Sequence, residues 1–361
     1  MKKQHLIFIL FLFIDSFAAA QNNNADTATL MRQADSLYSN QQYDEVFALY
    51  KQAAEQNYAK AQQSLGNCYY FGIGTTQDYK QAFEWYRKAA EQGNVIAQVN
   101  LGICYAEGQG VAQDYSQAVE WSKKAAEQGF AGAQNSLGLR YANGQGVTQD
   151  YSQAVHWYKK AAEQGNDYAQ ENLGVCYYFG RGVKQDYSQA FEWFKKAAEQ
   201  NFADAENNLG VCYYYGHGVT KDYKQAVEWY KKAVEQGSGD AQFGLGGCYY
   251  FGQGVKKNYS QAFDWYKKAA EQGNDEGQNS LGVCYYFGRG VKKNYSQAFE
   301  WFKKAAEQNN AGAQNNLGEC YKRGRGVAKD NNQAVYWYKK AAEQGNANAK
   351  KALKKMKVSY P

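Results

Sequence analysis

Seven cysteines and three histidines are the side chains of this 361-residue chain best suited to metal binding or nucleophilic chemistry. The cysteines are spread along the chain as Cys68, Cys104, Cys176, Cys212, Cys248, Cys284 and Cys320. Zinc sites bring cysteines together in C-x-x-C pairs or pairs slightly more widely spaced, and the chain contains no such pair. We therefore expect no metal centre and no cofactor, and we interpret the cysteines as small buried apolar residues.

His156 and His217 are the two histidines that follow residue 20. His156 precedes Trp157, and His217 stands between two glycines, each at a position of the repeat described below where other copies carry unrelated residues. Both are interpreted as tolerated surface variants rather than as a base or a ligand. The Gly-x-Gly sequences lack the third glycine of a dinucleotide-binding fingerprint. No catalytic constellation is recognisable, so we predict that the chain is not an enzyme.

Aromatic pairs and asparagines instead indicate recognition of a partner. The candidate binding residues are Tyr178, Phe179, Asn207, Tyr214, Tyr215, Tyr250, Phe251, Asn279, Tyr286 and Phe287. The corresponding pairs in neighbouring copies are Ala106-Glu107, Ala142-Asn143 and Lys322-Arg323, so the aromatic pairs are uninterrupted only in repeats four to seven. A contiguous apolar patch is typical of an interaction site, and Tyr is a frequent hot-spot residue. The alternative is that these rings pack between repeats, and the sequence does not separate the two.

A 36-residue repeat must position these side chains. The dipeptide Leu-Gly begins at Leu65, Leu101, Leu137, Leu173, Leu209, Leu245, Leu281 and Leu317. Self-similarity at a fixed period of 20 to 50 residues is typical of a solenoid. Each unit of a solenoid contacts its neighbours, which yields an extended binding surface. Eight copies fill residues 57–344, and we predict an all-α fold.

The fifth copy, residues 201–236, illustrates the unit. Apolar residues at helical spacing predict a first helix over 203–215, whose core face is formed by Ala205, Leu209, Cys212 and Tyr213. Gly210 removes a side chain where a neighbouring helix must approach closely. Gly216 and Gly218 then predict a turn, and Asp222 is expected to cap a second helix. Trp229 is expected to be the large apolar wedge of that helix.

The ends of the chain differ from the repeats. Residues 1–20 combine Lys2 and Lys3 with a short apolar run and Ala18-Ala19-Ala20, the pattern of a cleaved signal peptide. The run is too short to span a bilayer, which needs roughly 20 residues. We therefore expect a secreted or periplasmic chain with no transmembrane span. Residues 21–27 are expected to be disordered, residues 28–56 to form an N-terminal capping helix pair, and residues 345–361 a basic capping helix.

The repeat motif A-x-x-x-L-G-x-x-Y-x-x-G-x-G-V-x-x-D-x-x-x-A-x-x-W-Y-x-K-A-A-x-x-G resembles that of the Sel-one-like repeat family, relatives of the tetratricopeptide repeat. The resemblance covers residues 57–344. It implies a right-handed α/α superhelical solenoid that acts as a protein-interaction scaffold, with the second face of each first helix lining a concave groove. Some secreted relatives carry two bridged cysteines per repeat. This chain has one at most, so that disulfide framework does not carry over.

Three classes of function remain open. The favoured one is an exported, monomeric scaffold or adaptor that binds a protein or peptide in the groove of repeats four to seven. Four repeats span roughly 40 Å at ~10 Å each, which suits an extended peptide of about a dozen residues. The second class is a cell-wall glycan or peptidoglycan binder, because aromatic faces beside amides also suit sugars. The third is an enzyme with unrecognised residues. The mild net charge of +6 argues against nucleic acid.

Overall fold

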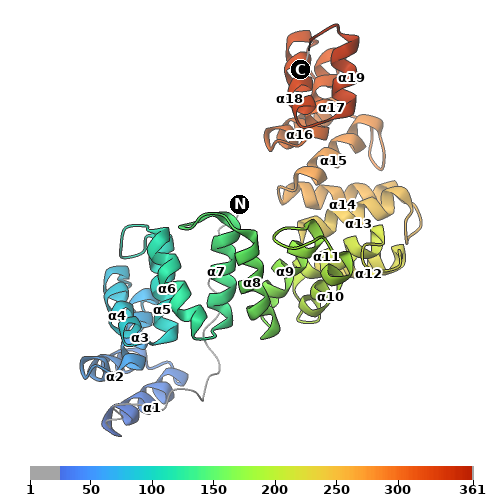
Figure 1. Cartoon of the computed structure of the whole chain (residues 1–361). Coiled ribbons are helices and arrows are strands. Elements are labelled where there is room, and N and C mark those ends of the chain that lie inside the picture. Colours follow the sequence, from blue (N-terminus) through green and yellow to red (C-terminus); the bar gives the residue numbers. More distant parts are fainter. Residues whose placement is uncertain (1–24, 360–361) are drawn as a thin grey trace. The chain divides into compact units, whose positions relative to one another are not determined.

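The computed structural model describes residues 25–359, which form nineteen α-helices and no β-strand (Figure 1). The expected signal peptide and residues 21–24 lie outside the described residues. The described chain divides into two compact units, one up to Arg140 with Gly144–Thr148, and one comprising Tyr141–Asn143 and the residues from Gln149 onward. The first helices are α1 (Ala25–Ser39), α2 (Tyr43–Glu55), α3 (Ala59–Phe71), α4 (Tyr79–Glu91), α5 (Val95–Glu107), α6 (Tyr115–Glu127) and α7 (Ala131–Asn143).

The remaining helices belong to the second unit. They are α8 (Tyr151–Glu163), α9 (Asp167–Phe179), α10 (Tyr187–Ala198), α11 (Ala203–Tyr215), α12 (Tyr223–Glu235), α13 (Gly239–Phe251), α14 (Tyr259–Glu271), α15 (Asp275–Phe287), α16 (Tyr295–Glu307), α17 (Ala311–Arg323), α18 (Asn331–Glu343) and α19 (Ala347–Lys355). From α3 to α18, odd-numbered helices are the first helices of the repeats and even-numbered helices are the second. The first helices α3, α5, α9, α11, α13, α15 and α17 each pack on their own second helix and on the preceding repeat.

The fifth repeat confirms the local predictions from sequence. Helix α11 covers the predicted residues, and Gly216 ends it in the left-handed conformation at φ 78°. Asp222 caps α12, where its carboxylate accepts hydrogen bonds from the backbone N–H groups of Lys224 and Gln225. Gly218 is required for a different reason: a Cβ there would lie 2.0 Å from the carbonyl oxygen of Tyr187. The turn of one repeat therefore packs directly against the start of the second helix in the preceding repeat.

In the fifth repeat the buried aromatic wedge is not the tryptophan that the sequence suggested. Trp229 is only half-buried, and the Lys232 ammonium lies 3.9 Å from its ring centre, a cation–π contact within one helix turn. The next residue, Tyr230, is the buried one. Its ring occupies the space above Gly210, whose Cβ would otherwise lie 2.5 Å from it. The sequence predicted that Trp229 and Tyr230 both belong to the core face of the second helix, but only Tyr230 reaches the interior.

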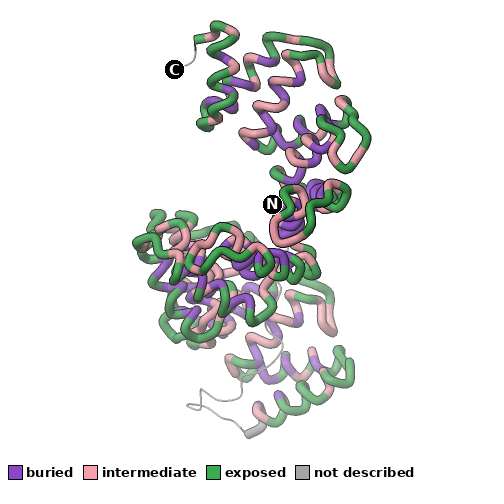
Figure 2. Tube along the Cα trace, turned by 90° about the vertical axis from the view of Figure 1, so that its right-hand side faces the viewer, coloured by how far each residue is buried: buried purple, intermediate pink, exposed green. Residues whose placement is uncertain are grey.

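Glutamine side chains link the two helices of one repeat and also reach the repeat before it. Gln200 follows the end of α10, and its Nε2 donates to Gln170 Oε1 at 2.9 Å. Gln170 Nε2 donates in turn to the carbonyl oxygen of Ala162 at 3.2 Å. Glu206 replaces the glutamine in the fifth repeat and accepts from Gln236 at 2.7 Å. These bonds satisfy polar groups that lie between the buried helix faces (Figure 2). The Gln200–Gln170 and Gln236–Glu206 bonds lie within one repeat, and the Gln170–Ala162 bond connects repeat four to the preceding repeat, as expected for a solenoid.

The cysteines are buried, as interpreted from the sequence, and the described ends of the chain are helical. All seven cysteines are free and buried. Helix α1 already begins at Ala25, so residues 25–27 are helical rather than disordered. The burial of Thr27 explains this, because a packed first turn is stabilised beyond its helix propensity. At the other end, α19 buries Ala349 and Leu353, and its lysines are exposed.

Candidate partner-binding groove

The second faces of α9, α11, α13 and α15 carry the candidate residues. Within the second unit α11 contacts α13, and α13 contacts α15. First helices that touch across repeats lie on the inner side of the stack, where the spacing between repeats is shortest. The candidate face therefore lies on the inner side of these repeats.

The two aromatic residues of each pair have different environments. The second residue is more than half exposed in all four repeats, at 57% for Phe179, 57% for Tyr215, 62% for Phe251 and 55% for Phe287. The first residue packs: the ring centres of Tyr214 and Tyr223 are 5.2 Å apart in an edge-to-face contact, and Tyr286 is only 9% exposed. The first residue of each pair therefore packs between repeats, whereas the second stays exposed.

The first tyrosines are held by the turn of the following repeat. Tyr214 donates a hydrogen bond to Gln253, Tyr286 accepts one from Arg325, and the Tyr178 hydroxyl lies 2.7 Å from His217 Nδ1. Burial raises the pKa of Tyr214 to about 12, so this hydroxyl stays protonated. The rings and turns form a series of contacts between repeats, so these tyrosines position the groove more than they offer contact area.

His217 is therefore more than the tolerated surface variant expected from sequence. Its ring stacks on Tyr187 with a centroid separation of 4.3 Å, and on Tyr215 at 5.4 Å. Its position is the middle of the Gly-x-Gly turn, where other repeats place Gln253 or Arg325 against the equivalent tyrosine. A shared role in holding that tyrosine explains why residue types as different as His, Gln and Arg serve there. His156, in contrast, is exposed.

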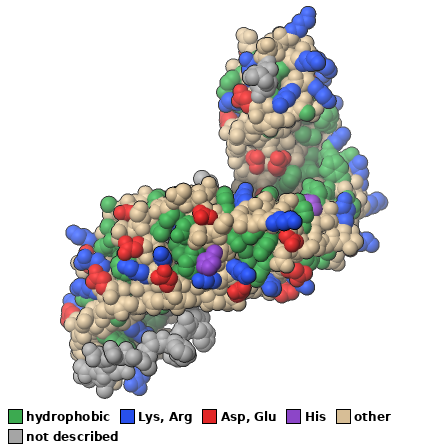
Figure 3. All heavy atoms as spheres, viewed as in Figure 1, with side chains coloured by type: hydrophobic (Ala, Val, Ile, Leu, Met, Phe, Trp, Pro, Cys, Tyr) green, Lys and Arg blue, Asp and Glu red, His purple; other side chains and the backbone are tan. Residues whose placement is uncertain are grey.

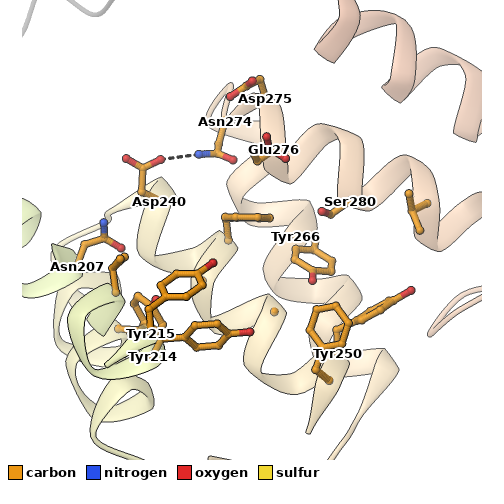
Figure 4. Close-up of a pocket in the computed structure, with 17 residues that line it drawn as sticks. Asn207, Tyr214, Tyr215, Asp240, Tyr250, Tyr266, Asn274, Asp275, Glu276 and Ser280 are labelled. Carbon is orange, nitrogen blue, oxygen red and sulfur yellow. Dashed lines mark hydrogen bonds between the residues drawn. The ribbon is translucent and has the colours of Figure 1, made fainter. Parts of the chain in front are cut away.

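A pocket of about 630 Å³ lies on this face within repeats five to seven (Figure 4). Five of the ten candidate residues line it: Asn207, Tyr214, Tyr215, Tyr250 and Phe251. The others, Tyr178, Phe179, Asn279, Tyr286 and Phe287, lie outside it. Asn279 is engaged in packing, since its side-chain oxygen accepts a hydrogen bond from Asn316 Nδ2 at 2.9 Å.

Several lining residues are not among the binding residues chosen from the sequence. Phe243, Gly244 and Gly247 come from α13, and Tyr230 and Tyr266 come from the second helices beneath it. The available signal was the departure of α13 from its neighbours: Gly247 stands where α11 has Val211 and α15 has Val283. A missing side chain in one copy of a repeat leaves a hollow at that copy.

One end of the pocket is acidic. Asp240, Asp275 and Glu276 line it, and Asn274 Nδ2 donates to Asp240 Oδ1 at 2.6 Å. Burial, followed by the charge of Asp275, raises the pKa of Glu276. Figure 3 shows acidic side chains beside hydrophobic ones where α14 and α15 lie. Among residues 25–359, no group of three or more His, Cys, Asp or Glu side chains is arranged to hold a metal ion.

These features define a helical repeat solenoid with a pocket on one face of repeats five to seven. The family model of the Sel1 repeat matches the chain at residues 42–58, 59–94, 95–130, 131–166, 167–202, 203–238, 239–274, 275–310 and 311–346. The chain belongs to the Sel1 repeat family. Proteins of this family are generally protein-interaction scaffolds, and the repeat is mainly a non-catalytic fold. The matched segments begin at the first helix of each repeat, two residues after the boundaries drawn from the sequence.

Two solved structures are similar over most of the chain. A protective antigen of uropathogenic Escherichia coli strains, which displays an SLR fold, is 44% identical with a TM-score of 0.68. The similarity covers 84% of this chain but 65% of the antigen, so the chain spans less than two thirds of that protein. A Sel1 repeat protein from Oxalobacter formigenes is 32% identical with a TM-score of 0.64, covering 96% of this chain and 98% of that one. No curated protein matches the chain.

No helix within residues 25–359 combines the length and apolar character needed to cross a membrane.

Proposed function

We propose that this chain is an exported, monomeric scaffold that binds a protein or peptide along the inner face of repeats four to seven. The observation that carries the proposal is the row of exposed rings at Phe179, Tyr215, Phe251 and Phe287, one per repeat. Exposed aromatic side chains supply large contact area at low entropic cost. Packed tyrosines beneath them hold the row in place, so little ordering is required on binding.

The pocket in repeats five to seven supports binding of a partner at this face. It joins apolar walls to a few polar groups, the combination found in ligand sites. Export rests on the sequence pattern of residues 1–20. A protein partner is favoured over a cell-wall glycan because the exposed rings recur across four repeats, a length suited to an extended chain.

A comparative pull-down from envelope and secreted fractions tests the proposal. The probe is residues 21–361, and the variant replaces Phe179, Tyr215, Phe251 and Phe287 by Ala. These rings are exposed, so the variant is expected to retain native helicity and melting temperature while losing the captured protein. Phe71→Ala is the matched control, because Phe71 is also exposed, at the same motif position of repeat one.

Equal capture by the native protein and the fourfold variant would place the interaction elsewhere. Retention of cell-wall fragments without any protein partner would favour the glycan-binding alternative. Fractionation of cells that express the full chain tests export, and light scattering of the purified protein tests the monomeric state.

A further inference from the structure

Repeat six differs from its neighbours at the positions that form the pocket. Helix α13 carries Phe243, Gly244 and Gly247, whereas the corresponding residues of α11 are Asn207, Asn208 and Val211. A Cβ at Gly247 would meet only the Tyr266 hydroxyl, 3.9 Å away. The space at this position is therefore open, and a side chain larger than that of glycine would fit into it.

Two buried tyrosines present hydroxyl groups at this hollow without a hydrogen-bond partner. Tyr230 is 3% exposed and Tyr266 is 4% exposed, and both line the pocket. In repeats one and eight the equivalent hydroxyl has a protein partner: Tyr86 donates to Asn67 at 2.8 Å and Tyr338 donates to Glu319 at 2.7 Å. The residues at those partner positions here are Val211 and Gly247, which have no polar side chain.

Both rings are buried, but their hydroxyl groups are not among the fully desolvated polar atoms of the described residues, so they face the open space of the pocket. Neither Tyr230 nor Tyr266 finds a hydrogen-bond partner among the described residues, so a ligand in the pocket is the natural source of one. Tyrosine hydroxyls both donate and accept. They can therefore bond either the N–H or the carbonyl groups of a peptide backbone.

The two ends of the pocket differ in chemistry. Asp240, Asp275 and Glu276 form the acidic end, and none of them forms an ion pair with a lysine or arginine in the part of the chain that the structure describes. Tyr215 and Phe251 form the aromatic end (Figure 4). Burial and the charge of Asp240 raise the pKa of the neighbouring Asp204, a further sign of concentrated negative charge.

A basic group on a ligand is directed toward the acidic end. The Arg289 guanidinium lies 5.1 Å from the ring centre of Tyr250 at the aromatic end, where it repels a second cation. Asp240 and Tyr250 are separated along α13 by ten residues, or about 15 Å at the helical rise. An extended peptide covers that distance with about four residues.

We propose that this pocket binds an extended segment of a protein partner in which a lysine or arginine stands about two to four residues from a large apolar side chain. The basic side chain lies against Asp240 and Glu276, and the apolar one lies against Tyr215 and Phe251. The Tyr230 and Tyr266 hydroxyls bond the intervening backbone. The inference rests on the proposed function and names the chemistry of the partner.

Fluorescein-labelled, end-capped peptides provide the probe. The reference peptide is Gly-Ser-Trp-Gly-Ser-Arg-Gly-Ser, and two analogues replace either Arg by Glu or Trp by Ser. Fluorescence anisotropy with residues 21–361 is expected to show binding of the reference peptide. Each analogue is expected to bind about tenfold more weakly, since each loses one of the two anchors.

Gly247→Val is the decisive variant, because it fills the hollow with the residue that α11 and α15 carry at the same position. Gly247→Val is expected to weaken binding of the reference peptide at least tenfold. Gly239→Ala is the matched control on the same helix: it lies outside the pocket lining and is expected to bind normally. The double variant Asp240→Asn/Glu276→Gln is expected to weaken binding of the reference peptide about tenfold. Binding of the analogue that carries Glu in place of Arg is expected not to weaken.

Tyr266→Phe removes one hydroxyl and keeps the ring, so it tests the backbone contact separately, with an expected severalfold loss. Equal binding of all three peptides, or normal binding by a folded Gly247→Val protein, would overturn the inference. Binding of a soluble peptidoglycan fragment instead, lost in Gly247→Val, would assign the pocket to a glycan and overturn it too. If the peptides fail but a protein is still captured through the exposed aromatic row, the scaffold function stands and this pocket assignment does not.

Discussion

Gly210 lies directly beneath the ring of Tyr230, so close that a Cβ at position 210 would stand 2.5 Å from the ring carbons Cδ1 and Cε1. The same relationship holds between Gly174 and Phe194 at 2.6 Å. In repeats one and four to eight, the glycine of the Leu-Gly dipeptide thus gives space to the buried aromatic of the second helix. Repeat two breaks the pattern, since Gly102 faces Ser122 Oγ at 3.1 Å.

Replacement of Gly210 by Ala is expected to destabilise the protein, because the methyl group must displace a packed ring. Overpacking of this kind costs about 1–3 kcal/mol. Gly102→Ala is the matched control and is expected to cost less than about 1 kcal/mol, because Ser122 leaves more room. Urea unfolding followed by circular dichroism measures both. Equal losses for the two variants would show that the ring does not set the requirement for glycine.

Local features of the repeat could be predicted from the sequence because they depend on neighbouring residues. The bounds of α11, the turn at Gly216 and the cap at Asp222 follow from helical periodicity, left-handed glycine and side-chain capping. The assignment of individual rings could not be predicted in the same way. Trp229 and Tyr230 are adjacent on one face, and only the position of α11 decides which of them is buried.

The groove was predictable in location but not in composition. Spacing placed Tyr214 and Tyr215 together on the second face of the helix. Whether each ring packs or is exposed depends on the turn of the next repeat, which supplies Gln253 to Tyr214. The open space of the pocket depends on Gly247, whereas the space at Gly244 is filled by the Tyr230 ring. Both glycines occur in a single copy, and a consensus read across repeats removes that information.

The thiols are expected to be unreactive in the native protein. Burial raises the pKa of Cys212 to about 12 and that of Cys176 to about 11, so neither thiol is ionised at neutral pH, and ionisation is needed for reaction. An aromatic disulfide reagent at pH 8 is expected to label none of the seven cysteines rapidly in buffer, and all seven in denaturant. Fast labelling of one or more native thiols would contradict this.

Arg140 occupies the cysteine position in repeat three, and its Nε is buried without a hydrogen-bond partner in the described part of the chain. Burial also lowers the pKa of the Arg140 guanidinium. Arg140→Cys is therefore expected to raise the free energy of unfolding by about 1–3 kcal/mol, the cost of an unsatisfied buried polar group. Thermal unfolding measures the change.

Arg140→Lys serves as the control for that prediction, because it keeps the charge at the same place. It is expected to give no stabilisation. A loss of stability in Arg140→Cys would indicate that the contact of Arg140 with the Tyr115 ring, at 5.9 Å, outweighs the unsatisfied Nε.

Glu171 is expected to make stability depend on pH. Burial, followed by the charge of Asp204, raises its pKa to about 7, while Asn208 Nδ2 donates to its carboxylate at 3.2 Å. The folded protein therefore holds a proton on Glu171 at pH values where the unfolded chain has released it. Its contribution to the free energy of unfolding is fully present below the ordinary pKa of 4.5 and is lost as pH rises through about 7.

Glu171→Gln replaces the carboxyl by a neutral group of the same shape and is expected to remove this dependence. The variant and the native protein are expected to be similarly stable at pH 4.5. At pH 8 the variant is expected to be more stable by about 1–3 kcal/mol, because only the native protein carries the buried charge. Urea unfolding across this range gives the comparison. Glu192→Gln, an exposed glutamate of the same repeat, is the control and should follow the native curve. Parallel curves for Glu171→Gln and the native protein would show that water or structural adjustment neutralises the cost of ionising Glu171.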